Sequence, residues 1–181
     1  THLEKYKGVN YLFHHTMLLQ EDMPTKGGFR SLCVEELIMD ESTLTIPVQK
    51  ATRGGVSQIK TLNPFDKVSG CTMFTSAEMW HESSGKVGEM AAQSLNSGSW
   101  IYIKGADFAQ SARSLIARVK GEGTIEFRLD DVNSDAVASF DFSTSDWQDL
   151  NTDFTEKISG EHDVYIVFSA KDIYLESWNV K

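Results

Sequence analysis

Short runs of alternating apolar and polar residues recur along most of the chain. A period of two is typical of β-strands with one buried face, because successive side chains of a strand point to opposite sides. The pattern is clearest in the run DVYIVFSA, where Val164, Ile166 and Phe168 fall on one face. The intervening Tyr165 and Val167 fall on the other face. The pattern predicts an all-β protein, with this strand central and buried on at least one side.

Eight such runs follow one another from Cys71 to the end of the chain, with turn residues between them. They are CTMFTSAEM, SWIYIKGADF, SARSLIARVK, GTIEFRLDD, AVASFDFST, DLNTDFTEKI, HDVYIVFSA and IYLESWNVK. Roughly eight strands in about 110 residues predict a β-sandwich of the jelly-roll, lectin-like kind. We place this domain at residues 70–181.

Residues 1–69 predict a smaller, strand-rich piece that ends in a linker around the Asn63-Pro64 pair. One strand covers Tyr11 to His15, a second lies in FRSLCVEEL, and the turn in MDESTLTIPV leads into a third. His14 and His15 are adjacent in the first strand, so their side chains point to opposite faces and at most one can reach a given site. Three short strands bury little apolar surface, so this piece is marginal without a partner surface.

The composition narrows the choice of partner. The chain has 181 residues, 40% of them hydrophobic, with a formal net charge of −9. Its 17 basic residues are scattered, which argues against nucleic-acid binding. No apolar run approaches the roughly 20 residues that span a bilayer, and the opening THLEKYKGVN has no apolar signal-peptide core. We expect a soluble chain that binds a neutral ligand or a cation, and neither nucleic acid nor a membrane.

Motifs for catalysis are weak. No serine stands in a GxSxG elbow, and His2, His81 and His162 have no evident partner in the sequence. The acidic runs fit a solvated surface better than a catalytic pair. Cys33 and Cys71 lie in no metal-binding spacing, and two buried thiols are favoured over a disulfide.

The second domain resembles a family 6 carbohydrate-binding module over residues 71–181. The motifs that carry the resemblance are the Ala-Glu pair at 77–78, the Gly-x-Trp-Ile step at 98–101, the ADF turn, the strand IEFRLD, the Gly-x-His-Asp step at 160–163 and the acid-Ser-Trp ending at 176–178. The resemblance implies a lectin-like β-sandwich that binds sugar in a cleft between loops. It also implies a structural calcium, with Glu78 and Glu176 as carboxylate ligands.

Sugars stack their C–H faces on aromatic rings, so the cleft needs aromatic side chains with polar neighbours. Trp147 stands where the family has one of its aromatics; the alternative is a Trp that covers the end of the sandwich. The second aromatic is missing around Ser94. Tyr174 replaces the family's asparagine, either as a substitute stacking surface or as a group that blocks the cleft. Two further aromatics, Trp100 and Trp178, fall inside strands and fit a core or an interface better.

The first piece is similar to the last stretch of the five-bladed β-propeller of family 43 glycoside hydrolases. NYLFHHT matches a Tyr-x-Phe-x-His strand, and GGFRS matches the Arg-Ser strand that follows it. The resemblance implies that His15 and Arg30 form a wall of the active centre; the alternative for His15 is a histidine satisfied within a core. Members of this family invert the configuration of the sugar with two carboxyl groups about 6.5–9.5 Å apart. The family carries these carboxyl groups on earlier blades of the propeller. We therefore expect no catalytic carboxylate in this chain.

Both resemblances point to the same class of enzyme, the arabinofuranosidases and xylosidases that act on arabinoxylan. They imply a secreted, periplasmic or cell-surface protein whose partners are xylan-type polysaccharide and the missing propeller portion. We expect the chain to be the carbohydrate-binding part of such an enzyme and inactive alone. The alternative is a structural module that stabilises the catalytic propeller without binding sugar.

Overall fold

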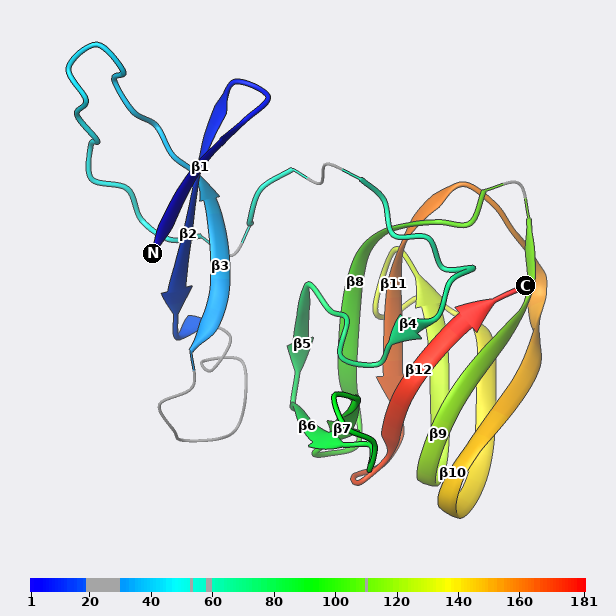
Figure 1. Ribbon diagram of the computed structural model, residues 1–181. Helices are drawn as coiled ribbons and strands as arrows, with labels where there is room; N and C mark the ends of the chain where they lie inside the picture. The colour runs from blue at the N-terminus through cyan, green and yellow to red at the C-terminus, as the bar shows by residue number, and fades with distance from the viewer. Residues whose placement is uncertain (19–29, 53, 58–59, 110) are drawn as a thin grey trace. The chain divides into compact units, whose positions relative to one another are not determined.

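The computed structural model describes residues 1–18, 30–52, 54–57, 60–109 and 111–181. Its regular elements are β-strands, which confirms the predicted all-β class. The chain divides into two compact units, Thr1–Ile59 and Lys60–Lys181 (Figure 1). The described part of the chain contains no helix long and apolar enough to cross a membrane.

The first unit contains a three-stranded antiparallel sheet in the order β1–β2–β3. Its strands are β1 (His2–Tyr6), β2 (Val9–Thr16) and β3 (Ser31–Glu36). Two predicted strands of this part of the chain coincide with β2 and β3. Gly8, in the turn between β1 and β2, has a φ of 85°, which glycine adopts without strain.

The third strand predicted for this unit is wrong. Asp40 and Thr45 form one isolated bridge, and residues 46–52 are not in a strand. The Asp40 carboxylate instead accepts a hydrogen bond from the backbone N–H of Ser42, at 2.9 Å, and holds a turn. β1 supplies the third strand, and no buried face marks it in the sequence because all five of its residues are exposed.

The second unit is built on a sheet of nine strands, in which β5–β8–β11–β9–β12–β7–β6 are neighbours in that order. β10 pairs with β9, and β4 pairs with β12. The strands are β4 (Val68–Ser69), β5 (Thr75–Ala77), β6 (Met79–Ser83), β7 (Met90–Ser94), β8 (Ser99–Asp107), β9 (Ala112–Leu129), β10 (Ala136–Ile158), β11 (Glu161–Phe168) and β12 (Tyr174–Val180).

The segment before β4 also packs with this unit. The backbone N–H of Leu62 donates to the carbonyl of Gly105 at 2.9 Å, and the N–H of Asp107 donates to the carbonyl of Leu62 at 2.8 Å. The N–H of Val180 donates to the carbonyl of Pro64 at 2.8 Å. The second unit therefore begins at Lys60, and residues 60–69 lie against it.

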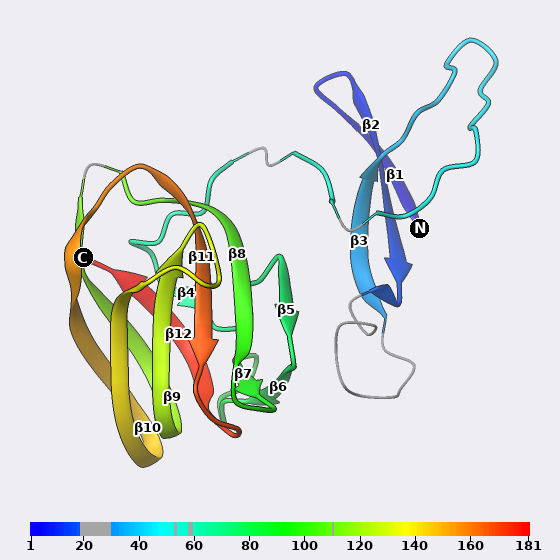
Figure 2. The same cartoon turned by 180° about the vertical axis from the view of Figure 1, so that it is seen from behind.

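Two long strands bend so that the sheet folds into two layers (Figures 1 and 2). The first half of β9 pairs with β12, and its second half pairs with β11. The bend falls at Gly121 and Gly123, whose φ angles are +120° and +137°. A Cβ on Gly121 would lie 2.6 Å from the carbonyl oxygen of Asp172, so only glycine fits there. β10 follows β9 through the bend with a register shift between Thr144 and Gln148.

Apolar side chains from both layers fill the core of the second unit. Val164, Ile166 and Phe168 are fully buried, whereas Tyr165 and Val167 are half-buried, as their alternation predicts. The opposite layer contributes further fully buried side chains, Leu115, Ala117, Val119 and Leu175. The predicted β-sandwich is confirmed.

Several strand boundaries differ from the prediction. Two pairs of predicted strands are continuous, because 112–120 and 123–129 lie in β9 and 136–144 and 149–158 lie in β10. β7 escaped prediction because its adjacent residues Ala91 and Ala92 are both fully buried, so its sequence does not alternate. Cys33 and Cys71 are free thiols, as predicted, but both are half-buried and not fully buried as expected.

Candidate functional site

Two aromatic side chains expected to bind sugar, Trp147 and Tyr174, are neighbours on the second unit. Their ring centroids are 6.4 Å apart, with an interplanar angle of 77°. Trp147 comes from the register shift in β10, and Tyr174 is the first residue of β12. Both strands pair with β9, which brings the two rings together from separate parts of the sequence.

Strand register extends this pair into a row. Tyr174 pairs with Lys120 of β9 and with Gln93 of β7, and Gln93 pairs with Trp80 of β6. Residues directly opposite each other in a sheet project from the same face. Trp80, Gln93, Tyr174, Lys120 and Trp147, all half-buried, are called the aromatic row below. With strands about 4.8 Å apart, the three strand steps from Trp80 to Lys120 span roughly 14 Å, and Trp147 contacts Tyr174 from the register shift of β10.

The aromatic row carries a cation and a neutral phenol. Lys120 Nζ lies 5.3 Å from the ring centroid of Tyr174 and 6.0 Å from that of Trp147, within cation–π distance. Burial, followed by the nearby carboxylates of Asp172 and Glu82, raises the pKa of Tyr174. Its hydroxyl therefore stays protonated through neutral pH and is available as a hydrogen-bond donor.

Ser94 does not mark a gap in the aromatic row. Its side chain is fully buried, and its hydroxyl donates to the carbonyl of Ala170 at 2.7 Å and accepts from the N–H of Ile173 at 3.0 Å. The preceding residue, Gln93, is the one in the row. Sequence reasoning missed Trp80, because only the pairing of β6 with β7 places it beside Gln93.

The two strand-interior tryptophans lie elsewhere in the second unit. Trp178 is 1% exposed and packs edge-to-face on Phe127, with centroids 5.5 Å apart, which confirms a core role. Trp100 contacts Tyr165 edge-to-face at 5.9 Å, and Tyr165 stacks on Tyr102 at 4.8 Å. These three rings occupy the outer face of the other layer, on the directly paired strands β8 and β11.

His162 has a partner that the sequence did not reveal. Its Nδ1 lies 2.8 Å from the carboxylate of Asp130, and its Nε2 lies 3.1 Å from the carbonyl oxygen of Ser159. Both ring nitrogens therefore face acceptors, and neither is left as a base for a nucleophile. The arrangement orients a loop and does not form a catalytic triad.

The two carboxylates expected to bind calcium have protein partners. Glu176 is 3% exposed and faces Lys67, Lys86 and Arg118. Glu78 accepts a hydrogen bond from Asn96 Nδ2 at 2.8 Å. Within the described residues, no group of three or more His, Cys, Asp or Glu side chains is placed to hold a metal ion. Because Ca²⁺ needs six to eight oxygen ligands and is repelled by cations, these residues do not fit a calcium site.

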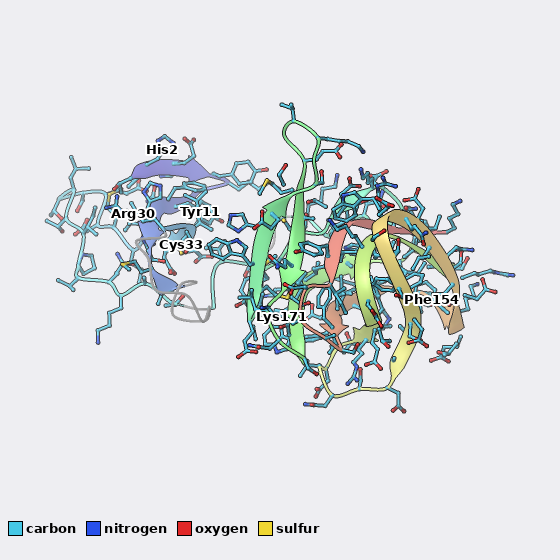
Figure 3. The ribbon with its side chains drawn as sticks, turned by 90° about the horizontal axis from the view of Figure 1, so that it is seen from below. His2, Tyr11, Arg30, Cys33, Phe154 and Lys171 are labelled. Carbon is cyan, nitrogen blue, oxygen red and sulfur yellow. The ribbon has the colours of Figure 1, made fainter. Side chains whose placement is uncertain are left out.

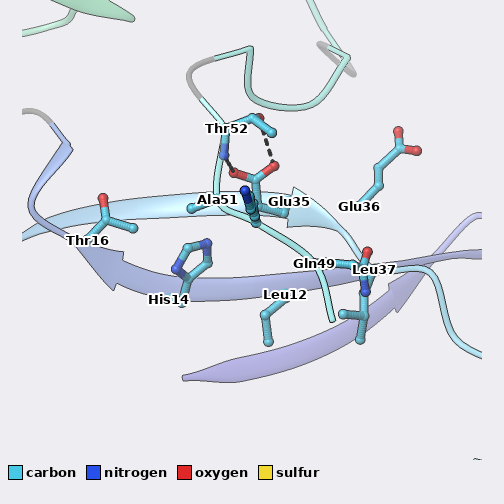
Figure 4. A pocket seen from close by; sticks show the side chains of 10 residues that line it. Leu12, His14, Thr16, Glu35, Glu36, Leu37, Gln49, Ala51 and Thr52 are labelled. Carbon is cyan, nitrogen blue, oxygen red and sulfur yellow. Dashed lines mark hydrogen bonds between the residues drawn. The ribbon is translucent and has the colours of Figure 1, made fainter. Parts of the chain in front are cut away.

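In the first unit, the strand splits the histidine pair as expected. His15 pairs with Leu32 and is exposed, whereas His14 pairs with Cys33 and is half-buried. His14 lines a cavity of about 550 Å³ on its own face of the sheet (Figure 4). Its Nε2 is buried and has no hydrogen-bond partner among the residues that the structure describes.

Arg30 lies immediately before β3 and is exposed (Figure 3). Two carboxylates, Glu35 and Glu36, line the cavity with His14, and Glu35 is already engaged. It accepts hydrogen bonds from Thr52, at 2.7 Å from the backbone N–H and 3.0 Å from the hydroxyl. The first unit therefore offers a polar cavity wall and two exposed side chains, His15 and Arg30.

A lectin-like β-sandwich with aromatic rings in a row, flanked by amide and carboxylate groups, defines a carbohydrate-binding class of protein. A family model, carbohydrate binding module (family 6), matches residues 69–181. The chain belongs to this family, and it carries a carbohydrate-binding module over that range.

Two comparisons extend beyond the module. The chain is 28% identical over 176 residues to the arabinoxylan arabinofuranohydrolase of Bacillus subtilis (strain 168), a match that covers 91% of the chain and 34% of that protein. It is also similar to the crystal structure of a glycoside hydrolase family 43 arabinoxylan arabinofuranohydrolase from Bacillus subtilis in complex with cellotetraose. That match has a TM-score of 0.80 and 25% identity, and covers 99% of this chain and 40% of the other.

A separate module has the same fold as the second unit. CsCBM6-3 from Clostridium stercorarium, in complex with cellobiose, matches with a TM-score of 0.62 and 18% identity, over 68% of this chain and 98% of the other. The chain is homologous to an arabinoxylan arabinofuranohydrolase of glycoside hydrolase family 43, and it spans about a third of the length of its curated relative.

Proposed function

We propose that the second unit binds arabinoxylan-type or xylan-type polysaccharide along the aromatic row. The contact between Trp147 and Tyr174, with ring centroids 6.4 Å apart, carries the proposal. The chain's homology to a protein named as an arabinoxylan arabinofuranohydrolase supports the choice of polysaccharide. A neutral chain of sugars suits a protein with a net charge of −9.

The polar groups beside the rings suit sugar hydroxyls. Gln93 Nε2 donates to Asp172 Oδ1 at 2.7 Å, which leaves the amide oxygen of Gln93 and the second carboxylate oxygen of Asp172 for sugar hydroxyls. Tyr174 adds a neutral hydroxyl. Rings supply apolar contact and these groups supply orientation, which is the usual division of work in a sugar site.

The first unit belongs, in this proposal, to the end of a family 43 catalytic propeller. Leu32 in β3 is 70% exposed, and Leu44, in the turn between Asp40 and Thr45, is 76% exposed. Such a surface suits packing against further chain, and the curated relative extends well beyond the matched segment. We propose His15 and Arg30 as an outer wall of the active centre that the rest of the enzyme completes. Calcium takes no part in the proposal, because cations surround Glu176.

The proposed substrate also sets the location. Polymeric xylan does not enter cells, so the parent enzyme works outside the cytoplasm, as a secreted, periplasmic or cell-surface protein. The chain alone supplies no catalytic pair in this proposal.

One purified sample tests both parts of the proposal. In native gel electrophoresis, soluble arabinoxylan in the gel is expected to retard the full chain relative to a gel without polysaccharide. In parallel, the same sample is expected to release no arabinose or xylose from aryl glycosides. A chain that migrates equally in both gels contradicts sugar binding, and measurable sugar release contradicts the assignment of catalysis to the rest of the enzyme.

The raised pKa of Tyr174 gives a pH prediction. Because the pKa of Tyr174 is raised above the ordinary phenol value of about 10, the neutral form of its hydroxyl predominates below that pH. Retardation by arabinoxylan is therefore expected to stay constant between about pH 7 and pH 9. A loss of retardation within this window would show that an ionised phenol, or another titrating group, controls binding.

A structural role without sugar affinity is the second candidate. The observation that favours it is the cluster of Trp100, Tyr102 and Tyr165 on the outer face of the other layer, joined by Phe74, which is 42% exposed and meets Tyr102 edge-to-face at 5.6 Å. Aromatic surfaces of this kind are typical of contacts between domains. This candidate predicts no retardation by any polysaccharide in the same gels.

A further inference from the structure

Glu176 is a buried carboxylate surrounded by protein cations. Its Oε2 lies 3.2 Å from Arg118 Nε and 3.5 Å from Lys67 Nζ, and its Oε1 lies 3.6 Å from Lys86 Nζ. The side chain of Glu176 is 3% exposed. A buried charge without a counter-charge is strongly destabilising, so these contacts decide whether β12 can hold an ionised side chain here.

Further acids balance the cations. Arg118 Nη1 also contacts the carboxylate of Asp149 at 3.1 Å, and Lys86 Nζ contacts that of Glu89 at 3.2 Å. The hydrogen bond from Lys86 is the main reason why the pKa of Glu89 is lowered. Three cations thus meet three carboxylates. This cluster, made of Lys67, Lys86, Glu89, Arg118, Asp149 and Glu176, is called the ion cluster below.

The ion cluster joins segments that are far apart in the sequence. Lys67 directly precedes β4, Lys86 and Glu89 lie in the β6–β7 hairpin, and Arg118 lies in β9. The same hairpin carries Trp80 and Gln93 of the aromatic row. The backbone carbonyl of Glu176 adds a further tie, because it accepts the N–H of Gly70 at 2.7 Å.

A cavity of about 470 Å³ opens beside Glu176, and its lining includes Lys67, Lys86 and Arg118. A divalent cation that entered this cavity would meet their positive charges before it reached the carboxylate. Each oxygen of Glu176 already has a cation within 3.6 Å. Glu176 Oε1 and Arg118 Nε make no hydrogen bond within the described residues, so the cations balance the charge of Glu176 as ion pairs.

We infer that Lys67, Lys86 and Arg118 replace a structural calcium at Glu176, so that this module keeps its fold without a metal. The carboxylate that the family resemblance assigns to calcium is neutralised here by side chains of the chain itself. The ammonium and guanidinium groups join the ends of the sandwich chain, which is the task that the ion would otherwise perform.

Thermal unfolding of the full chain, followed by tryptophan fluorescence, tests the inference. All four tryptophans lie in the second unit, so the signal reports that unit alone. Millimolar calcium and a chelator are expected to give midpoints within about 1 °C of each other. Titration calorimetry with calcium alone is expected to show no stoichiometric binding. A calcium-dependent rise in the midpoint, or one bound calcium per chain, overturns the inference.

Variants test whether the cations of the ion cluster stabilise the second unit. Arg118→Met is expected to lower the midpoint by at least about 5 °C, because it removes the nearest cation from a buried carboxylate. Lys86→Met is expected to give a smaller fall, since Lys86 is 57% exposed. The control, Lys171→Met, removes an exposed lysine that lies 3.9 Å from Asp172, and is expected to change the midpoint by no more than about 1 °C.

The two variants keep the test decisive. If Arg118→Met does not fold, the fall for Lys86→Met and the wild-type calcium titration still decide. An Arg118→Met midpoint equal to that of the Lys171→Met control contradicts the inference. A rise of the midpoint with calcium in both the wild type and either variant also contradicts it.

Discussion

Replacing Trp147 with alanine is expected to weaken binding to arabinoxylan by about 2 kcal/mol, or roughly 30-fold in affinity. Trp147 provides the largest ring surface next to Tyr174, at a centroid distance of 6.4 Å. It is half-buried at the register shift of β10, so its removal leaves the core intact. Affinity electrophoresis over a series of arabinoxylan concentrations gives the dissociation constant.

Trp100→Ala is the matched control. Trp100 is also a half-buried tryptophan of the second unit, but it contacts Tyr165 on the other layer. The control is expected to keep wild-type retardation. If Trp100→Ala lowers the affinity as much as Trp147→Ala, the sugar does not bind selectively along the aromatic row. If Trp147→Ala is retarded as much as the wild type, sugar binding along the aromatic row is contradicted directly.

Gly121→Ala is expected to destabilise the second unit by roughly 2–4 kcal/mol. Gly121 has a φ of +120°, where a side chain is strained, and an added Cβ would lie 2.6 Å from the carbonyl oxygen of Asp172 and 3.1 Å from the Cα of Ile173. Both neighbours are backbone atoms next to Tyr174, so the clash cannot be relieved by a side-chain rotation. Urea unfolding followed by tryptophan fluorescence measures the change.

Gly85→Ala separates backbone strain from the clash. Gly85 also has a positive φ, +92°, but no atom lies within 4 Å of an added Cβ. Its substitution is expected to destabilise by only about 1 kcal/mol. Equal losses of stability for the two variants would show that the close approach of β9 to the β11–β12 connection is not what requires glycine at position 121.

Local patterns account for most of the fold of the second unit. The alternation of Val164, Ile166 and Phe168 predicts their buried face correctly, because burial on one side of a strand imposes a period of two. The pattern fails where that condition is absent. β1 has no buried residue, and Ala91 and Ala92 in β7 are both fully buried. In these strands the pairing partners, not the local sequence, determine the structure.

The candidate site was only partly predictable. Trp147 and Tyr174 were identified by their place in the family pattern, and the structure brings them together. The family pattern does not include Trp80, and it puts the second aromatic near Ser94, which is fully buried. The cations around Glu176 were also missed, because Lys67, Lys86 and Arg118 are widely separated in the sequence. Which cation neutralises a carboxylate depends on the distance between the two charges in the folded structure. The spacing of the residues along the chain does not give that distance.

By itself, the sequence determined the all-β class, the sandwich of the second unit and its membership of a carbohydrate-binding family, because strand periodicity and local motifs are written in neighbouring residues. Tertiary structure alone decided that Trp80, Gln93, Tyr174, Lys120 and Trp147 form one row, and that Glu176 meets protein cations. Both arrangements depend on the register of strands that are distant in sequence and on the bend of β9 at Gly121. The physical reason is that long-range pairing and close packing select these contacts from many that local preferences allow equally.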